Sequence, residues 1–380
     1  MNILVTGAKG FIGKNLCVTL RNINEGKDKS FSIQPPLNIF EYDIDTNPSL
    51  LDEYCSKADF VFNLAGVNRP KDEEEFMSGN YGFASTLLEC LRKHKNKCPV
   101  MLASSIQATQ DNPYGRSKKA GEDLFFKYAK ETGARVLIYR FPNVFGKWCR
   151  PNYNSAIATF CHNIARGLPI TVNDDNVIMK LVYIDDVITE LINALIGKGT
   201  RKGDFFEVKI TYTITLGEIV KLILSFKSNR EEKTVPDMSD DFTRKLYATY
   251  LSYLPFDQFN YPLKMNIDGS GSFTEIIRTN DRGQFSVNIT KPGVVKGNHW
   301  HHSKNEKFLV VSGMGVIRLR RVDSEEVIEY YVDGEKLEVI DIPPGYTHNI
   351  ENLGDTDLIT FMWASECFNP EKTDTFYEIV

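Results

Sequence analysis

The pattern of apolar and polar positions changes once along the chain. Up to about residue 245, continuous apolar runs such as 1–6 and 58–66 alternate with segments whose apolar residues have helical spacing, such as 14–21. Continuous apolar runs are typical of strands that are buried on both faces of a parallel sheet. The pattern therefore predicts an α/β domain of Rossmann type over residues 1–245.

From residue 263 onward the apolar positions recur with a period of two. They form many short runs, such as 284–290 and 307–311, that Gly and Asp residues separate. Short strands at close spacing predict an all-β sandwich or barrel over 263–380. Between the two domains, the aromatic residues of 247–253 and the helix breakers Pro255 and Pro262 indicate a linker at 246–262.

Composition restricts the classes of function. The 380 residues have a formal net charge of −5 and a pI near 5.8, which argues against a nucleic-acid binder. No apolar run approaches the roughly 18 residues that a membrane helix needs, and the chain begins directly with a predicted strand, so we expect neither membrane insertion nor a signal peptide. Seven cysteines without a C-x-x-C pair suit a reducing environment. We expect a cytoplasmic protein whose partners are small molecules or protein.

A glycine-rich turn follows the first predicted strand. Gly7, Gly10 and Gly13 form G-x-x-G-x-x-G immediately before a predicted helix. Glycines let the backbone approach a pyrophosphate, and the helix N-terminus offers that group free N–H donors. Asp43 and residues 63–66 end two further predicted strands at the edge where such a dinucleotide lies, although Asp43 could instead cap a turn. The sequence therefore predicts a dinucleotide site.

The expected cofactor is NADPH. NAD-selective folds place an acid about 20 residues after the glycine turn, where it binds the ribose hydroxyls. This chain has Phe-Ser-Ile-Gln-Pro-Pro at 31–36, with no acid. Without a carboxylate there, nothing repels a 2′-phosphate, and Lys9, Lys14 and Arg21 could bind it.

Tyr114 and Lys118 form the candidate acid–base pair. They are four residues apart and share one face if the segment is a helix. A free tyrosine has a pKa near ~10, and a lysine cation one turn away should lower that pKa and fit the phenol for proton transfer. The predicted strand 101–105 ends in two hydroxyls that could bind a substrate oxygen opposite the tyrosine. The alternative is a solvated Tyr and Lys on a helix surface.

These pieces, in their order and spacing, resemble the extended short-chain dehydrogenase/reductase family over residues 1–240. The matching motifs are Gly7-x-x-Gly10-x-x-Gly13, Asp43-Ile44, Asn63-Leu-Ala-Gly66, Asn80, Ser104-Ser105, Tyr114-x-x-x-Lys118, 140–146 and 181–187. The resemblance implies a proton relay of Ser105, Tyr114 and Lys118, and hydride transfer at a sugar carbon. It also implies a cofactor site formed by Gly7, Gly10, Phe11, Ile12, Gly13, Asp43, Ile44, Leu64, Ala65, Gly66, Tyr114 and Lys118.

The same resemblance indicates where a nucleotide sugar would bind. By the family pattern, Asn143 and Lys180 would lie beside the sugar or the diphosphate. Arg150 and Arg166 add cations that suit a nucleotide diphosphate, although a solvated surface role is equally open for each. Residues 106–107 are Ile-Gln where the dehydratases of this family have an acid pair, which favours ketone reduction over elimination of water.

Histidines gather in the second predicted domain. His299 and His301 lie at i and i+2, and Glu306 and His348 complete a set of three imidazoles and one carboxylate. Such a set suits Zn, Mn, Ni or Fe, and we expect a divalent metal, zinc in the first place. A surface cluster of histidines without a metal is the alternative.

This domain resembles the cupin family in both of its motifs. Gly293-x5-His299-x-His301-x4-Glu306-x6-Gly313 and Pro343-x-Gly345-x2-His348-x3-Asn352 match, and Leu337 departs from a Gly at the start of the second motif. The resemblance implies a jelly-roll barrel with those four side chains as metal ligands. Residues 284–299 also resemble the nucleotide-sugar 3,5-epimerase cupins, in which a histidine at the place of His299 is the base, so the identity of the base stays open.

Together the two domains resemble the bifunctional nucleotide-sugar enzymes of capsular polysaccharide biosynthesis. The resemblance implies C3 epimerisation of a UDP-2-acetamido-2,6-dideoxy-hexos-4-ulose in the cupin and NADPH reduction at C4, toward UDP-N-acetyl-L-fucosamine, in a homodimer. One alternative is a reductase whose cupin only dimerises. Another is proton chemistry by Cys149 and His162 inside the reductase site, and a third is an NADP-binding scaffold without turnover, although such proteins usually lack the Tyr/Lys pair.

Overall fold

The computed structural model describes all residues except 71, 280, 370 and 372, and it divides into two compact units. The first comprises Met1–Leu224 and Ser239–Pro255, and the second Ser225–Met238 and Phe256–Val380. The segment 246–262, expected as a linker, is therefore divided after Pro255. Its first part belongs to α9 (Asp241–Leu251), which packs on α6 (Ala156–Ala165) of the first unit.

The first unit is built around a seven-stranded sheet with the order β2-β1-β3-β4-β5-β9-β8. Every pairing is parallel except that of β8 with β9. The strands are β1 Asn2–Thr6, β2 Asn38–Tyr42, β3 Phe60–Asn63, β4 Val100–Ser105, β5 Val136–Phe141, β8 Arg201–Lys202 and β9 Phe205–Phe206. The predicted Rossmann-type parallel sheet is confirmed.

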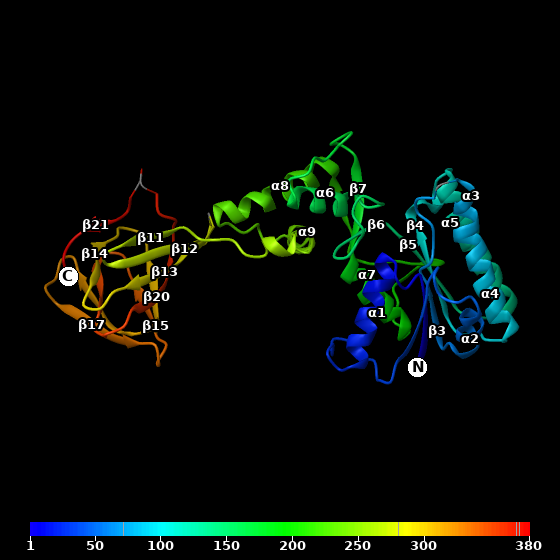
Figure 1. Cartoon of the computed structure of the whole chain (residues 1–380), viewed down its shortest axis with the longest axis horizontal. Helices are drawn as coiled ribbons and strands as arrows, with labels where there is room; N and C mark the ends of the chain where they lie inside the picture. Colours follow the sequence, from blue (N-terminus) through cyan, green and yellow to red (C-terminus); the bar gives the residue numbers. More distant parts are fainter. Residues whose placement is uncertain (71, 280, 370, 372) are drawn as a thin grey trace. The chain divides into compact units, whose positions relative to one another are not determined.

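Helices cover both faces of this sheet (Figure 1). One face carries α1 (Phe11–Asn24) and α7 (Ile184–Leu195), and the other carries α2 (Ser49–Lys57), α4 (Phe83–Lys93) and α5 (Pro113–Thr132). β1 shows why the strands are apolar throughout: Ile3 and Val5 pack in the core under α1, whereas Leu4 packs in the core on the opposite face.

The strand beside β1 comes later in the chain than residues 31–36, where the acid of NAD-selective folds was sought. The described residues 31–36 form no strand, and β2 pairs with β1 instead. Pro35 and Pro36 explain this, because proline donates no hydrogen bond to a sheet. The residue that follows the strand next to β1 is Asp43, so the prediction that no acid occupies this place is wrong.

A smaller sheet completes the first unit. Its order is β10-β7-β6, with β6 Asn143–Phe145, β7 Ile178–Tyr183 and β10 Tyr212–Thr215. α8 (Leu216–Glu232) follows β10, and the boundary between the units falls inside it. Within the described part of the chain, every helix is too short or too polar to cross a bilayer.

The second unit consists of two antiparallel sheets, with the orders β11-β12-β13-β20-β15-β18 and β17-β16-β19-β14-β21. The first sheet contains β11 Met265–Asp268, β12 Gly271–Thr279, β13 Gly283–Thr290, β15 Glu306–Ser312, β18 Val339–Ile342 and β20 Leu358–Ala364. The second contains β14 Val295–Trp300, β16 Met314–Arg321, β17 Val327–Asp333, β19 Tyr346–Asn352 and β21 Phe376–Tyr377. The predicted all-β, cupin-like domain is confirmed.

The interior of this unit has an apolar part and a polar part. Phe308, Ile317 and Ile350 belong to an apolar core formed mainly by β15, β16, β18 and β19. On β13 the alternation is reversed, because Ser286 and Asn288 are buried while Phe285 is exposed. Buried polar side chains need partners, so the polar part is where an ion or a polar ligand can be held.

Candidate active site and metal centre

The glycine turn of the first unit lies against the end of β3. Gly7 and Gly10 lie between β1 and α1. Gly7 has φ +67°, and a Cβ there would lie 2.7 Å from the backbone N of Ala65, whereas a Cβ on Gly13 would lie 2.1 Å from the carbonyl O of Gly7. The N-terminus of α1 has no side-chain cap and no acid in its first turn. Its N–H groups are therefore available to an anion such as a pyrophosphate.

Asp43 and Ile44 follow β2 at the same edge of the sheet. Asp43 Oδ2 accepts a hydrogen bond from Lys9 N at 2.7 Å, and Asp43 Oδ1 accepts one from Ile44 N at 2.8 Å. The Asp43 carboxylate is therefore engaged in holding the glycine turn. The side chain of Ile44 is 99% exposed.

Of the three cations proposed for a 2′-phosphate, Lys9 lies in this turn and Lys14 near the start of α1, whereas Arg21 lies in the last turn of that helix. Lys9 forms an ion pair with Asp45, and Arg21 forms one with Glu41. Lys14 Nζ lies 5.3 Å from the ring centroid of Trp148. Both ion pairs are solvent-exposed, and exposed pairs contribute only about 0–1 kcal/mol, so a phosphate can exchange with the carboxylates at little cost.

The structure brings Ser105, Tyr114 and Lys118 together. Tyr114 lies in the first turn of α5, which Asn112 caps, and Lys118 lies one turn later with Nζ 5.7 Å from the centroid of the Tyr114 ring. Ser105 ends β4, and its side chain hydrogen-bonds that of Tyr114. The sheet edge and the helix start therefore form one site.

The pKa of Tyr114 differs from the expected one. Burial raises the pKa of Tyr114, and the hydrogen bond with Ser105 opposes that rise only in part. The predicted lowering by Lys118 is therefore wrong, because the loss of solvation opposes the phenolate more strongly. A phenol that keeps its proton is a proton donor rather than a base at neutral pH.

Lys118 is also shifted toward its neutral form. Burial lowers the pKa of Lys118 to about 8, and the Glu122 carboxylate opposes that shift. Lys118 Nζ donates to the carbonyl O of Ala103 at 3.2 Å. A Cβ on Gly66 would lie 3.1 Å from Nζ and 2.7 Å from Oδ1 of Asn80, so the residue opposite the amine has to be small.

Of the two adjacent serines, only Ser105 is directed toward Tyr114. Ser104 Oγ donates to Glu122 Oε1 at 2.6 Å, and Arg140 binds both oxygens of that carboxylate at 2.8 and 2.6 Å. Glu122 is completely buried and was not found from the sequence. Its position four residues after Lys118, on the same helix face, was the signal that could have found it.

A pocket of about 780 Å³ lies beside this site. It is lined by Ile106, Gln107, Thr109, Gln110, Arg140, Asn143, Ile178 and Lys180. Of the predicted substrate residues, it includes Asn143 and Lys180. Arg150 lies outside this lining with its guanidinium over the ring of Tyr153, and Arg166 donates to the carbonyl O of Tyr253 at 2.8 Å.

Cys149 is not activated for proton abstraction, whereas the lowered pKa of His162 leaves its imidazole neutral. Burial raises the pKa of Cys149 to about 11, so the thiol stays protonated. Burial and the charge of Arg166 lower the pKa of His162, whose own carbonyl O accepts from Arg166 at 3.2 Å. Neither residue lines the pocket described above.

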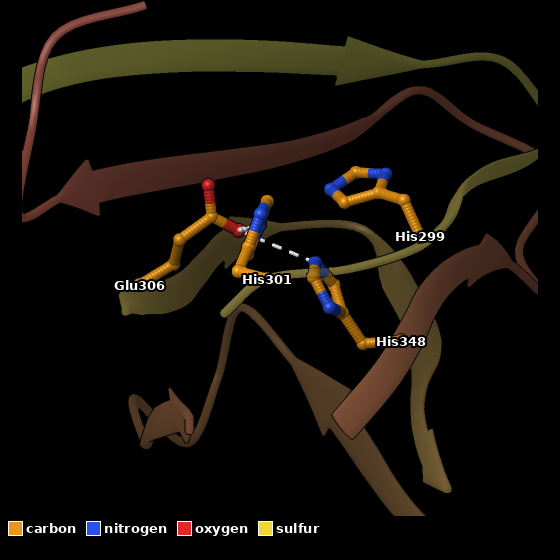
Figure 2. Close-up of side chains that lie close together, drawn as sticks. All are labelled: His299, His301, Glu306 and His348. Carbon is orange, nitrogen blue, oxygen red and sulfur yellow. Dashed lines mark ion pairs between the residues drawn. The ribbon is translucent and has the colours of Figure 1, made fainter. Parts of the chain in front are cut away.

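In the second unit, His299, His301, Glu306 and His348 point toward one another (Figure 2). Their ligand atoms all lie within 4.8 Å of one another. Antiparallel pairing explains the arrangement, since His299 of β14 is opposite His348 of β19. Glu306 begins β15, and Nε2 of His348 and of His301 lie 3.2 and 3.6 Å from its Oε2.

These four residues fit a divalent ion. Among the described residues, Nε2 of His301, Nε2 of His348 and Oε2 of Glu306 are buried without a hydrogen-bond partner. Burial raises the pKa of Glu306, but the two imidazoles and Lys304 outweigh it and hold that pKa well below its usual range. Burial and the charge of His348 lower the pKa of His299 to about 4. An anionic carboxylate and a neutral imidazole are the forms that coordinate a metal.

Two families match the chain. The NAD dependent epimerase/dehydratase family matches residues 3–208, and the polysaccharide biosynthesis C-terminal domain family matches residues 266–376. The two matches correspond to the α/β unit and the all-β unit of the structure.

Two relatives cover essentially the whole chain. A UDP-2-acetamido-2,6-beta-L-arabino-hexul-4-ose reductase from Pseudomonas aeruginosa is 41% identical and covers 99% of this chain and 98% of its own. The crystal structure of the capsular polysaccharide assembling protein CapF from Staphylococcus aureus shows 54% identity and a TM-score of 0.93, with both chains covered completely. A UDP-glucuronic acid 4-epimerase from Bacillus cereus, 21% identical with a TM-score of 0.52, covers 67% of this chain and 96% of its own and shares the fold alone.

Proposed function

The chain belongs to the NAD dependent epimerase/dehydratase family, and from this premise we propose that it is a bifunctional nucleotide-sugar enzyme. The second unit epimerises C3 of a UDP-2-acetamido-2,6-dideoxy-hexos-4-ulose, and the first unit reduces the C4 ketone, toward UDP-N-acetyl-L-fucosamine. The observation that carries the proposal is one chain with two sites: a half-buried Tyr114 beside a buried Lys118, and a cluster of three imidazoles and a carboxylate. The name of the Pseudomonas reductase supports the substrate class.

Reduction of the ketone needs a proton for the C4 oxygen. A nicotinamide cofactor bound at the glycine turn would supply the hydride. Tyr114, whose pKa burial raises, donates the proton to the oxygen. Ser105 holds the same oxygen by a hydrogen bond, and the Lys118 cation stabilises the phenolate that remains. The three residues thus act as a proton-delivery site.

The pocket supports reduction rather than loss of water. Ile106 and Gln107 line it, and the described lining contains no carboxylate. Elimination of water needs an acid and a base beside the sugar. Asn143 and Lys180 supply an amide and a cation, which suit the hydroxyls and the diphosphate of a nucleotide sugar.

We assign NADPH as the cofactor. Asp43 would disfavour a 2′-phosphate if its carboxylate were free. Its two oxygens instead accept hydrogen bonds from the backbone N–H groups of Lys9 and Ile44. Lys9 and Arg21 are held only by exposed ion pairs. A 2′-phosphate could therefore recruit Lys9 from the glycine turn and Arg21, which reaches Glu41 on β2 from the last turn of α1.

Epimerisation at C3 belongs to the cupin unit in this proposal. The C4 carbonyl acidifies the C3 hydrogen, and a divalent ion, which we take as zinc, would supply Lewis acidity to such a site. His301, Glu306 and His348 would hold it through their unpartnered atoms. His299 is also close enough to serve as a ligand, and it is the most exposed of the four. It is therefore the residue that can act as either ligand or base.

Deuterium exchange tests the two activities separately. In deuterated water, a Tyr114→Phe chain without NADPH should still exchange the C3 hydrogen of the 4-keto sugar, because exchange needs no hydride. It should not oxidise NADPH, because the proton donor is gone. His348→Ala should stop the exchange and leave the first unit able to reduce the unepimerised ketone. Mass spectrometry of the recovered sugar nucleotide measures both.

The outcomes separate the alternatives. Exchange that survives both metal removal and His348→Ala would rule out catalysis by the cupin and leave it a structural or dimerising role. Loss of exchange in Cys149→Ser but not in His348→Ala would place the proton chemistry in the reductase unit. Substantial NADPH oxidation by Tyr114→Phe would overturn the assignment of the proton donor.

We also propose a cytoplasmic homodimer that pairs through its cupin units. The outer face of the six-stranded sheet is apolar: Phe285 is opposite Ile277 on β12 and stacks on Phe361, with ring centroids 5.5 Å apart. Exposed apolar groups in a row are a common feature of interfaces between subunits. Light scattering should show a dimer for the wild-type chain and a monomer after Phe285→Asp.

A further inference from the structure

The loop between β14 and β15 carries one candidate metal ligand and leads directly into a second. It comprises residues 301–305, with His301 at its start and Glu306 immediately after it. The loop has no strand of its own, so its backbone N–H groups need partners outside the two ladders. Whatever holds this loop also sets the positions of two ligands.

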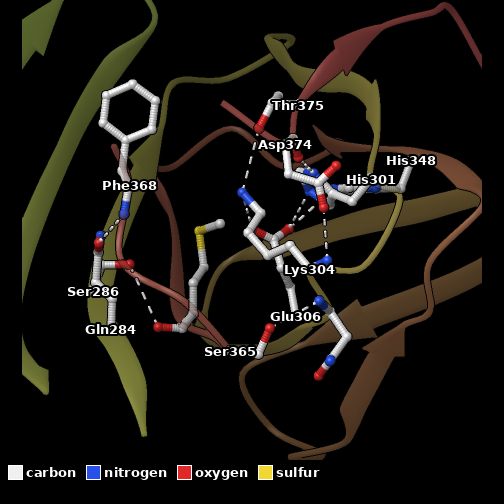
Figure 3. Close-up of polar contacts among 12 residues, drawn as sticks. Gln284, Ser286, His301, Lys304, Glu306, His348, Ser365, Phe368, Asp374 and Thr375 are labelled. Atoms are coloured by element: carbon white, nitrogen blue, oxygen red, sulfur yellow. Dashed lines mark hydrogen bonds and ion pairs between the residues drawn. The ribbon is translucent and has the colours of Figure 1, made fainter. Parts of the chain in front are cut away.

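Asp374 is the main partner of the loop (Figure 3). Its Oδ1 accepts from His302 N at 2.8 Å, and its Oδ2 accepts from Ser303 N at 2.8 Å and from Lys304 N at 2.9 Å. Ser303 Oγ also donates to Oδ2, at 3.1 Å. Burial raises the pKa of Asp374, but these donors outweigh it and hold that pKa well below its usual range. Asp374 is therefore an anion that accepts hydrogen bonds from three consecutive backbone N–H groups.

The main chain of the same residue fixes the imidazole of His301. The carbonyl O of Asp374 is hydrogen-bonded to His301 Nδ1. A carbonyl can only accept, so Nδ1 carries the proton and Nε2 is left with its lone pair. His301 is 1% exposed, and its Nε2 faces Oε2 of Glu306. One residue thus sets both the tautomer and the orientation of a ligand.

The next residue extends the arrangement to Glu306. Lys304 Nζ lies 3.5 Å from Glu306 Oε1 and 3.4 Å from Thr375 Oγ1. The lysine occupies Oε1 and leaves Oε2 for an ion, so the carboxylate is prepared to bind through one oxygen. Lys304 is itself held by the same segment: its backbone N donates to the Asp374 carboxylate, and its side chain donates to the Thr375 hydroxyl.

The segment that carries Asp374 is fixed at its other end. Phe376 and Tyr377 form β21, which pairs with β14 so that Tyr377 is opposite His299. Glu378 N donates to the carbonyl O of Asn298 at 3.0 Å. Residues 374–378, the C-terminal strap, therefore contact the segments that carry three of the four ligands.

We propose that Asp374 is a positioning residue for the metal centre, which holds the ligand loop and orients His301 before an ion binds. The inference rests on the proposed metal site. Residues that orient ligands in this way change metal affinity by about 10- to 100-fold when they are replaced. The contacts of Asp374 are with His301 and with residues 302–304, so its effect on the metal centre runs through His301 and the ligand loop.

The test compares metal binding in full-length chains. Asp374→Ala should weaken zinc binding, measured by competition with a chelator, by about 10- to 100-fold, and Asp374→Asn, which keeps one acceptor oxygen, should lie between it and the wild type. Asp333→Ala is the matched control. Asp333 Oδ1 also accepts two backbone N–H groups in a loop of the same unit, from Glu335 and Lys336, at 2.8 Å each.

A cobalt-substituted chain supplies a second measurement. The visible absorption of bound cobalt reports the number and geometry of the ligands, so it should change in Asp374→Ala and stay unchanged in Asp333→Ala. A fall in thermal stability alone, with wild-type zinc affinity and cobalt spectrum, would overturn the positioning role. Wild-type protein that takes up no zinc or cobalt would instead overturn the metal centre itself.

Discussion

Replacement of Lys118 by methionine should stabilise the protein while it abolishes turnover. Burial lowers the pKa of Lys118 from 10.5 to about 8, so the folded state disfavours the cation. Each pKa unit corresponds to about 1.4 kcal/mol, which gives about 3 kcal/mol at neutral pH. Loss of the hydrogen bond to Ala103 offsets about 1 kcal/mol of this. The expected net gain in the free energy of unfolding is about 2 kcal/mol.

The gain should depend on pH with a definite sign. The folded pKa of Lys118 lies below its unfolded pKa. Below about pH 8 both states carry the proton, and the full cost of the buried cation is present. Between pH 8 and 10.5 the unfolded state binds more protons, so the stability of the wild type rises with pH relative to the variant. Above 10.5 both states are neutral, and the advantage of methionine disappears.

Calorimetry at neutral pH and at pH 10 measures this difference. Two units can unfold separately, so the transition of the first unit is identified as the one that NADPH shifts upward. Lys119→Met is the control, because Lys119 pairs with Asp123 on the exposed side of the same helix and should change stability by no more than about 0.5 kcal/mol. A Lys118→Met chain no more stable than the wild type, or an advantage that does not shrink at pH 10, would refute the reasoning.

Three further predictions concern the same unit. Gly13→Ala should abolish cofactor binding in a fluorescence titration, because the added Cβ would lie 2.1 Å from the carbonyl O of Gly7. Gly10→Ala should retain measurable binding, because its Cβ would lie 3.1 Å from the same oxygen. NADPH should exceed NADH in kcat/KM by about tenfold or more, and Arg21→Ala should reduce the ratio; equal values for the two cofactors would contradict the assignment. Activity that depends on the Lys118 cation should fall as pH rises through about 8, and Glu122→Gln, which removes the charge that raises this pKa, should move the fall to lower pH.

The parts that could be predicted from the sequence are those in which neighbouring residues decide the geometry. The glycine turn between β1 and α1 and the pair Tyr114 and Lys118 on one helix are both local patterns. The candidate metal set spans a longer stretch, but two of its members lie on strands that pair with each other, with His299 opposite His348. Continuous apolar runs indicated the α/β unit, and apolar positions with a period of two indicated the all-β unit. This difference was sufficient to separate the two fold classes.

The parts that could not be predicted depend on distant segments. In the sheet, β2 lies next to β1, and Asp43 follows β2. Nothing local in 31–36 shows that this segment does not pair with β1. The raised pKa of Tyr114 comes from burial, which spacing alone does not reveal. Asp374 belongs to no motif, and its role becomes visible only when the chain end lies against the loop that follows β14.

The order of the two proposed reactions follows from the chemistry of one carbonyl. The C3 hydrogen is acidic only while C4 is a ketone, because the enolate delocalises its charge onto that oxygen. Reduction removes the carbonyl and fixes whichever configuration C3 has at that moment. Burial raises the pKa of Tyr114 and lowers the pKa of Lys118, so the first unit is suited to deliver protons at neutral pH. The reductase step therefore has to follow the epimerase step. A Tyr114→Phe chain, in which the candidate metal ligands are unchanged, should accumulate 4-keto sugars of both C3 configurations.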